Sequence, residues 1–400
     1  MISDNSSIIA ARLMSEFAER TALLSPAARD QQRYLWTDAF AVCNFLELFK
    51  RTGDQKYRRC ATELIDRVHR VLGRYRDDDV RIGWISGLDE RTACDHPTTG
   101  GLRIGKPFKE REPSEPIDER LEWDRDGQYF HYLTKWMHAL CQAAFVTGEP
   151  AYARWAVELG EAAIKGFVRR SESKIVGVYW KMSTDLSRPL VPATGQHDAL
   201  DGFITFREAR HAIAKMPTDK AATDLSAAIE SLAALCEHKD WTTDDPLGIG
   251  GLLFDACRLC RLDSEQRVGD ARLLEEIIDA GGNGFIAFLA SHDLNRPASH
   301  RLAFRELGLA IGLRALPIIA TAIIKEKSGV GNRPAFRQAM DLLQQHESLG
   351  EEIVGAWLLH ARRPDESWQA HQNINEVMLA TALIPDTFLS VGKLGTPNAS

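Results

Sequence analysis

The sequence predicts an all-α protein built from about six helical hairpins. Residues 52–64 realign 95 positions later with residues 147–159, and eight of the thirteen positions match in identity or acidic character. Self-similarity of this kind indicates a repeated supersecondary unit. Apolar residues recur at helical spacing on both sides of each turn, and the alternation typical of half-buried strands is almost absent.

The two copies of the repeat predict the first two hairpins. The leading helices are expected at about 33–51 and 127–146, and the trailing helices at about 55–75 and 150–169. Gly53 and Gly148 occupy the turns, where a helix C-terminus favours a residue that can take positive φ. The leading helices are more apolar, so we expect them to be buried on several sides and the trailing helices on one.

The same alternation continues with weaker similarity. A third leading helix is expected from Asp198 with a turn at 216–218, and a fourth from Leu247 with a turn at 262–264. The fourth opens with Gly248-Ile249-Gly250-Gly251, a run that would give it room for close approach to a neighbour. The fifth and sixth are expected to start at about 299 and 367, with outer helices at 333–345 and 349–361. Pro317 interrupts the pattern, so the helix count between 317 and 366 is left open.

Two long connections lead into inner helices, at residues 84–125 and 171–196. Connections of this length in a compact protein are usually functional. The short strand candidates at 80–85 and 175–180 fall in or beside them, and we expect loop hairpins there, not a sheet.

Composition excludes several classes of protein. With 49 Lys and Arg against 56 Asp and Glu, the net charge is -7, and 44% of residues are apolar. Such a chain is neither disordered nor fibrous, and it has no overall positive field for nucleic acid. The N-terminus lacks a basic leader, and the apolar run at 315–324 is shorter than the ~20 residues of a membrane span. We therefore expect a soluble, cytoplasmic protein with no nucleic-acid or membrane partner.

No cofactor is expected. The seven cysteines have irregular spacing, and Cys257 and Cys260 form a CxxC inside a helical pattern without a second pair, so buried apolar roles are favoured over a metal. The sequence also lacks the glycine-rich nucleotide motifs, the serine-hydrolase elbow and the zincin motif.

Six hairpins, each with an apolar inner helix, an amphipathic outer helix and a TG[DE]xxY turn in the first two, resemble the (α/α)6 toroids of the six-hairpin glycosidase superfamily. That superfamily includes the N-acylglucosamine 2-epimerase type of sugar isomerase. The resemblance covers nearly the whole chain in architecture and matches no single family's catalytic motif. It implies one toroid domain over residues 1–400 that acts on carbohydrate, with long loops on the active-site side.

Polar and aromatic residues gather at the starts of the expected inner helices, which would share one central funnel if the ring closes. Such a lining suits a sugar, because hydroxyls need donors and acceptors and a pyranose face stacks on aromatic rings. The candidate substrate-binding residues are Trp36, Trp123, Gln128, Tyr129, Trp180, Arg103, Lys106, Arg301, His300, His371 and Asn375. Inner-helix aromatics also fill cores, whereas Trp123 and Trp180 fall on loops. The cations suit a carboxylate or phosphate, with surface solvation as the alternative.

Glycosidic cleavage requires two carboxyl groups, one protonated and one ionised. The best pair is Asp38 with Asp198 or Asp201, which lie near the mouths of different inner helices. Asp198 also stands where a carboxylate would cap its helix. Asp201 is one turn deeper in an apolar segment, where burial without a purpose is costly.

The histidines favour a different reaction. A neutral imidazole can take and return a proton beside a sugar carbonyl, as an epimerase or isomerase requires. His131 and His197 are the catalytic candidates of this kind. The sequence therefore predicts a glycoside hydrolase acting on a small-molecule or oligosaccharide substrate. A sugar epimerase and a non-catalytic helical repeat binding protein are the alternatives, and the oligomeric state is left open.

Overall fold

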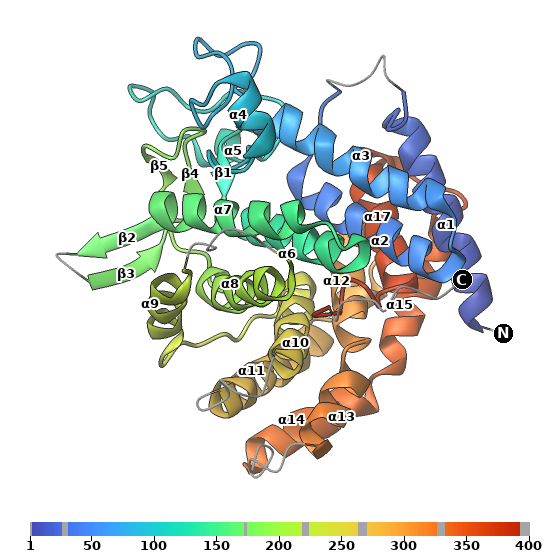
Figure 1. Ribbon diagram of the computed structural model, residues 1–400. Coiled ribbons are helices and arrows are strands. Elements are labelled where there is room, and N and C mark those ends of the chain that lie inside the picture. The colour runs from blue at the N-terminus through green and yellow to red at the C-terminus, as the bar shows by residue number, and fades with distance from the viewer. Residues whose placement is uncertain are drawn as a thin grey trace. The chain divides into compact units, whose positions relative to one another are not determined.

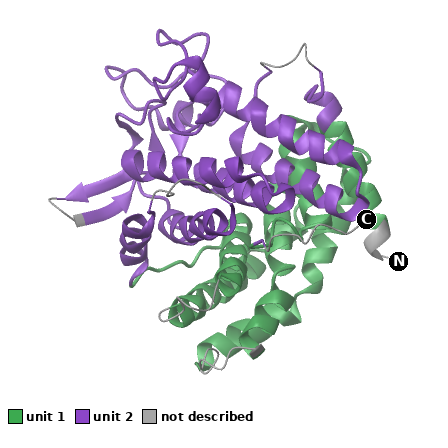
Figure 2. Cartoon of the chain, in the orientation of Figure 1, with its two compact units in different colours: residues 1–17, 238–391 green, residues 18–237, 392–400 purple. Residues whose placement is uncertain are grey.

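The computed structural model describes residues 2–25, 31–171, 174–217, 224–262, 270–325 and 333–392 (Figure 1). Of the described residues 65% are helical and 5% lie in strands, so the prediction of a mostly helical protein is confirmed. Contacts divide the chain into two compact units (Figure 2). Unit 1 comprises residues 1–17 and 238–391, and unit 2 comprises residues 18–237 and 392–400.

Unit 2 contains three helical hairpins, which are α2 (Leu35–Thr52) with α3 (Gln55–Leu72), α6 (Phe130–Thr147) with α7 (Pro150–Phe167), and α8 (Asp198–Lys215) with α9 (Ser226–Cys236). The leading helix α6 packs against both other leading helices, α2 and α8. Every residue of α2 from Leu35 to Leu48 is buried, whereas α3 buries one face. The predicted difference between inner and outer helices is therefore confirmed for this pair.

The repeated turn has the same hydrogen bonds in both copies. Gly53 and Gly148 have φ of 70° and 75°, and each N–H donates to a carbonyl of the preceding helical turn. The acidic residue that follows accepts a backbone N–H of the next helix, at 2.9 Å for Asp54 and 3.3 Å for Glu149. The predicted helix ends follow from this local chemistry.

The predicted hairpin at 175–180 is present as two paired strands, β2 (Val168–Ser171) and β3 (Lys174–Val178). A three-stranded antiparallel sheet also forms, in the order β1 (Gln128–Tyr129), β4 (Lys181–Met182) and β5 (Pro189–Val191). The expectation that the connection at 171–196 forms no sheet is therefore wrong, because strands of two or three residues are too short to show alternation in the sequence. Residues 80–85 contain no strand and only an isolated bridge from Trp84.

The long connection at 84–125 carries two short helices, α4 (Glu90–Asp95) and α5 (Glu119–Glu122). Buried arginines fix it to its surroundings, since Arg103 donates to the carbonyls of Val71 and Arg74 and Arg111 donates to that of Leu190. Within unit 2, α4, α5 and the short strands gather at one end of the helices (Figure 1). These elements lie beside the starts of α6 and α8 (Figure 1).

Unit 1 is also helical. Its elements are α10 (Pro246–Arg261), α11 (Asp270–Ser291), α12 (Ala303–Leu313), α13 (Leu316–Lys325), α14 (Pro334–Gln345), α15 (Ser348–His360), α16 (Glu366–Ala370) and α17 (Gln372–Leu383), and α1 (Ile2–Arg20) begins in it. The fourth leading helix starts one residue before the predicted position. Close approach of α10 to α12 depends on Gly250, where a Cβ would lie 2.1 Å from the Gly308 oxygen.

Other boundaries in unit 1 differ from expectation. The fifth leading helix begins at Ala303, after 3-10 turns at Asp293–Asn295 and Ala298–His300. The sixth is broken at His371 into α16 and α17. The turns predicted at 216–218 and 262–264 lie partly outside the described residues.

One helical stretch, Ala303–Ile324, is long and apolar enough to cross a membrane by length and composition. It is longer than the apolar run at 315–324 because α12 and α13 follow each other directly. Just over half of its most apolar window is buried inside the protein, and core helices of soluble proteins pass the same test.

Candidate functional site

The starts of α6 and α8 bring two acidic and two basic side chains together in unit 2. His131 Nδ1 lies 3.6 Å from Asp198 Oδ1, and Lys135 Nζ lies 2.8 Å from Asp201 Oδ2. Both aspartates are at most 7% exposed, whereas the His131 side chain is 29% exposed. The structure therefore joins three of the predicted catalytic residues, Asp198, Asp201 and His131, into one cluster.

The two aspartates have different surroundings. Asp201 accepts a 2.5 Å hydrogen bond from the Thr134 hydroxyl in addition to its ion pair with Lys135. Asp198 Oδ2 is buried and has no hydrogen-bond partner among the described residues, and the same is true of His131 Nδ1. A negative charge is thus compensated at Asp201 and uncompensated at Asp198.

These surroundings shift the proton affinities. Burial, with a smaller contribution from the Asp201 charge, raises the pKa of Asp198 from 3.8 to about 7. Burial, with a smaller contribution from the Lys135 charge, lowers the pKa of His131 to about 4. Near neutral pH, Asp198 therefore retains a substantial protonated fraction beside an uncharged imidazole.

A group of contacting aromatic rings adjoins this cluster. It consists of Trp123, Trp180, Tyr129 and His131, which we call the aromatic file. Successive centroids are 5.1, 5.3 and 5.3 Å apart, and the His131 ring also lies 6.4 Å from that of Trp180. The Tyr129 ring stacks on both Trp180 and His131, at interplanar angles of 30° and 24°. Trp123 at the outer end is 54% exposed. Tyr129 is 3% exposed, whereas Trp180 and His131 are partly exposed, so these two rings and Trp123 present aromatic surface to solvent.

Two further tyrosines adjoin the file. Tyr132 packs edge-on against Tyr129 and His131, and its hydroxyl lies 2.6 Å from that of Tyr34. The Lys106 ammonium lies 5.4 Å from the centre of the Tyr34 ring. Of the predicted cations, Lys106 is thus the one that the structure places beside these aromatic residues.

Chemically, this arrangement combines partly exposed aromatic rings with an enclosed, protonatable carboxyl and a neutral imidazole. Aromatic faces bind the C–H surfaces of sugars, and a carboxyl with a raised pKa can act as a general acid near pH 7. Neighbouring titratable groups whose environments separate their proton affinities are typical of acid–base sites.

Other predicted residues of unit 2 have structural partners. Asp38 is buried against Arg33, with contacts of 2.5 and 2.9 Å. Trp36 is buried and packs on Phe40 at 4.4 Å. Each therefore has a role that needs no substrate.

Gln128 and Arg103 hold backbone. The Gln128 amide accepts from the N–H of Leu102 and donates to the carbonyls of Gly100 and Thr184. Besides its ion pair with Asp126, Arg103 donates to the carbonyl of Val71 in the last turn of α3 and to that of Arg74, just after the helix. His197 precedes α8, and its carbonyl accepts the N–H of Asp201.

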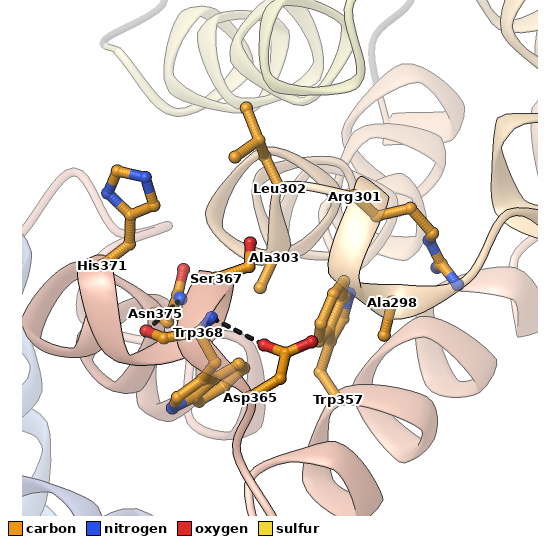
Figure 3. Close-up of a pocket in the computed structure, with 10 residues that line it drawn as sticks. All are labelled: Ala298, Arg301, Leu302, Ala303, Trp357, Asp365, Ser367, Trp368, His371 and Asn375. Carbon is orange, nitrogen blue, oxygen red and sulfur yellow. Dashed lines mark hydrogen bonds between the residues drawn. The ribbon is translucent and has the colours of Figure 1, made fainter.

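Three of the predicted residues of unit 1 line one small pocket (Figure 3). Arg301, His371 and Asn375 surround a small space that leaves no room for a water molecule. Arg301 points away from His371 toward its ion-pair partner Glu306, 2.7 Å distant. Asn375 donates to the Trp368 carbonyl, while its own oxygen lacks a partner among the described residues. His300 is exposed beside Ser299.

Sequence reasoning missed Lys135, Thr134, Tyr132 and the buried Lys181. Lys135 stands four residues after His131, a spacing that places both on one helix face, so this signal was available. Lys181 could not be found in this way, because its partners come from a segment 56 to 59 residues earlier.

The described residues contain no group of three or more His, Cys, Asp or Glu side chains that could hold a metal. Cys257 is buried against the Leu389 carbonyl, and burial raises its thiol pKa to about 11. The surroundings of Cys257 thus match those of a small buried apolar residue. No protein-family model, curated protein or solved structure matches this chain.

Proposed function

We propose that the protein is a carbohydrate-active enzyme with an (α/α)6 toroid fold that hydrolyses a glycosidic bond at Asp198 and Asp201. One observation carries the proposal: two neighbouring carboxyls at the inner end of an aromatic file have opposite charge compensation. Among the described residues Asp198 Oδ2 has no hydrogen-bond partner, whereas Asp201 is paired with Lys135.

In this mechanism the sugar stacks on the exposed rings of the aromatic file, with the scissile bond beside Asp198. Asp198 donates its proton to the glycosidic oxygen as the bond to the anomeric carbon breaks. The oxygen of a water molecule bonds to that carbon, and the water gives its proton to the ionised carboxylate of Asp201. Thr134 and Lys135 orient that carboxylate through their contacts with it.

A second candidate is epimerisation at the carbon beside a sugar carbonyl. It is favoured by the position of His131, whose uncharged Nδ1 is unpartnered among the described residues and lies 3.6 Å from Asp198. The imidazole would take the carbon-bound proton, and a proton would return to the opposite face of the resulting enediol.

One NMR experiment in D2O separates the two reactions. The protein is incubated with nitrophenyl glycosides, reducing hexoses and N-acetylhexosamines. Hydrolysis produces new anomeric signals from a released sugar, whereas epimerisation replaces the C2 proton by deuterium without bond cleavage. Substrate signals that broaden or transfer saturation without chemical change would indicate a binding protein.

Asp198→Asn is expected to abolish hydrolysis, because it removes the proton donor to the glycosidic oxygen. Asp124→Asn is the matched control, because Asp124 is an exposed aspartate of the same unit and neighbours the aromatic file at Trp123. An Asp198→Asn protein that keeps full turnover would refute the assignment of the acid. A wild-type protein that converts none of these sugars would refute the proposed function for them.

A further inference from the structure

Lys181 is a fully buried lysine whose ammonium group binds backbone. It lies in β4 with no exposed surface. Its Nζ donates to the carbonyl of Glu122 at 2.6 Å and to the carbonyl of Arg125 at 2.8 Å, and lies 3.4 Å from the Glu122 carboxylate. A single cation thus closes a turn of the chain at residues 122–125.

That turn carries Trp123, and Lys181 itself directly follows Trp180. The one ammonium therefore joins the two segments that bear the outer indoles of the aromatic file. The backbone of Trp180 is fixed independently, because its N–H donates to Ala193 at 2.8 Å and its carbonyl accepts from Phe130. Lys181 attaches the turn that carries Trp123 to the strand that follows Trp180.

Burying the charged ammonium of a lysine at this position has an unfavourable desolvation free energy. Burial lowers its pKa to about 8, although the Glu122 charge acts in the opposite direction. Methionine has a similar length and would fill the same volume without desolvating a charge. The directional hydrogen bonds are what the apolar replacement cannot supply.

We infer that Lys181 is a positioning residue for substrate binding, which sets the separation of the Trp123 and Trp180 rings through its bonds to the turn at 122–125. The inference rests on the proposed function for its substrate class, a sugar stacked on the aromatic file. The clamp itself is a property of the fold and can be tested without any substrate.

The first test is fluorine NMR of protein labelled with 5-fluorotryptophan, which carries nine tryptophan signals. Trp123→Phe and Trp180→Phe assign the two relevant signals. Lys181→Met is expected to shift the Trp123 signal and to change its width, with a smaller effect at Trp180 and none at Trp241 in unit 1. Lys109→Met is the control, because Lys109 is an exposed lysine of the same long connection that pairs with Glu112.

The second test is kinetic. Because stacking acts on bound substrate and transition state alike, Lys181→Met is expected to raise KM about tenfold with kcat unchanged. Lys181→Gln, which keeps an N–H donor on a shorter side chain, serves if the methionine variant does not fold. Circular dichroism establishes that each variant is folded.

Each result decides a different statement. An unmoved Trp123 signal in a folded Lys181 variant overturns the inference, whatever the activity. A loss of kcat at constant KM also overturns it, since Lys181 would then act on the chemical step. A shifted Trp123 signal in a protein that converts no sugar upholds the clamp and refutes only the proposed function.

Discussion

Replacing Asp198 by asparagine should remove a specific pH dependence of stability. In the unfolded chain this carboxyl releases its proton near pH 4, whereas in the folded protein it does so at about pH 7. Between those values the unfolded state is deprotonated and the folded state is still protonated. Rising pH therefore destabilises the fold over this interval and has no further effect on this group above it.

The magnitude follows from the displaced pKa. The slope is about 1.4 kcal/mol per pH unit between pH 4 and 7, so the total loss is about 4 kcal/mol. The side chain is 7% exposed, so solvent screening reduces this value little. Asparagine carries no charge at any of these pH values, and the variant should lack this decline.

The measurement is the free energy of unfolding by urea at half-unit steps from pH 4 to 9, for wild type and Asp198→Asn. All other titrating groups cancel to first order in the difference between the two proteins. The unfolding free energy of the variant minus that of wild type should increase with pH up to about pH 7 and then remain constant. A difference that is flat over the whole range would refute the claim that Asp198 is buried without compensation.

The remaining predictions concern single contacts. Arg33→Met leaves the Asp38 carboxylate buried without its partner and should cost about 3–5 kcal/mol of unfolding free energy, measured with urea. Trp123→Ala should weaken sugar binding about tenfold in a titration while leaving the melting temperature within about 1 °C, because the indole is half exposed. Gly53→Ala and Gly148→Ala should each cost about 1 kcal/mol from backbone strain alone, since a Cβ at either position meets no atom. Equal stability of these alanine variants and wild type would contradict the left-handed turn geometry.

Local chemistry explains why parts of the fold could be predicted. The ends of α2 and α6 follow from Thr-Gly-acid turns, whose hydrogen bonds lie within a few residues of each other. The sequence predicts only that His131 and Asp198 lie at the same end of the helical hairpins, because both stand at the start of an inner helix. Their 3.6 Å separation depends on how α6 packs against α8, which periodicity does not encode.

The failures have an equally physical origin. The sequence predicts Asp38 as a catalytic carboxylate because it lies in the first turn of an inner helix, yet Arg33, five residues earlier, neutralises it. The Gln128 amide is predicted to bind substrate, but it is bonded to the backbone of Gly100, Leu102 and Thr184. Polar residues near a helix start serve the neighbouring loops as often as they serve a ligand, and only partners distant in sequence distinguish the two cases.

The attachment of the long connection affects how a ligand reaches the site. Arg103 donates to the carbonyls of Val71 and Arg74, Arg111 donates to that of Leu190, and Lys181 ties the end of the segment to β4. Swinging the segment aside on the timescale of catalytic lids would break these bonds together. Association should therefore be a single diffusional step whose observed rate rises linearly with ligand concentration, without the plateau that a preceding opening step imposes.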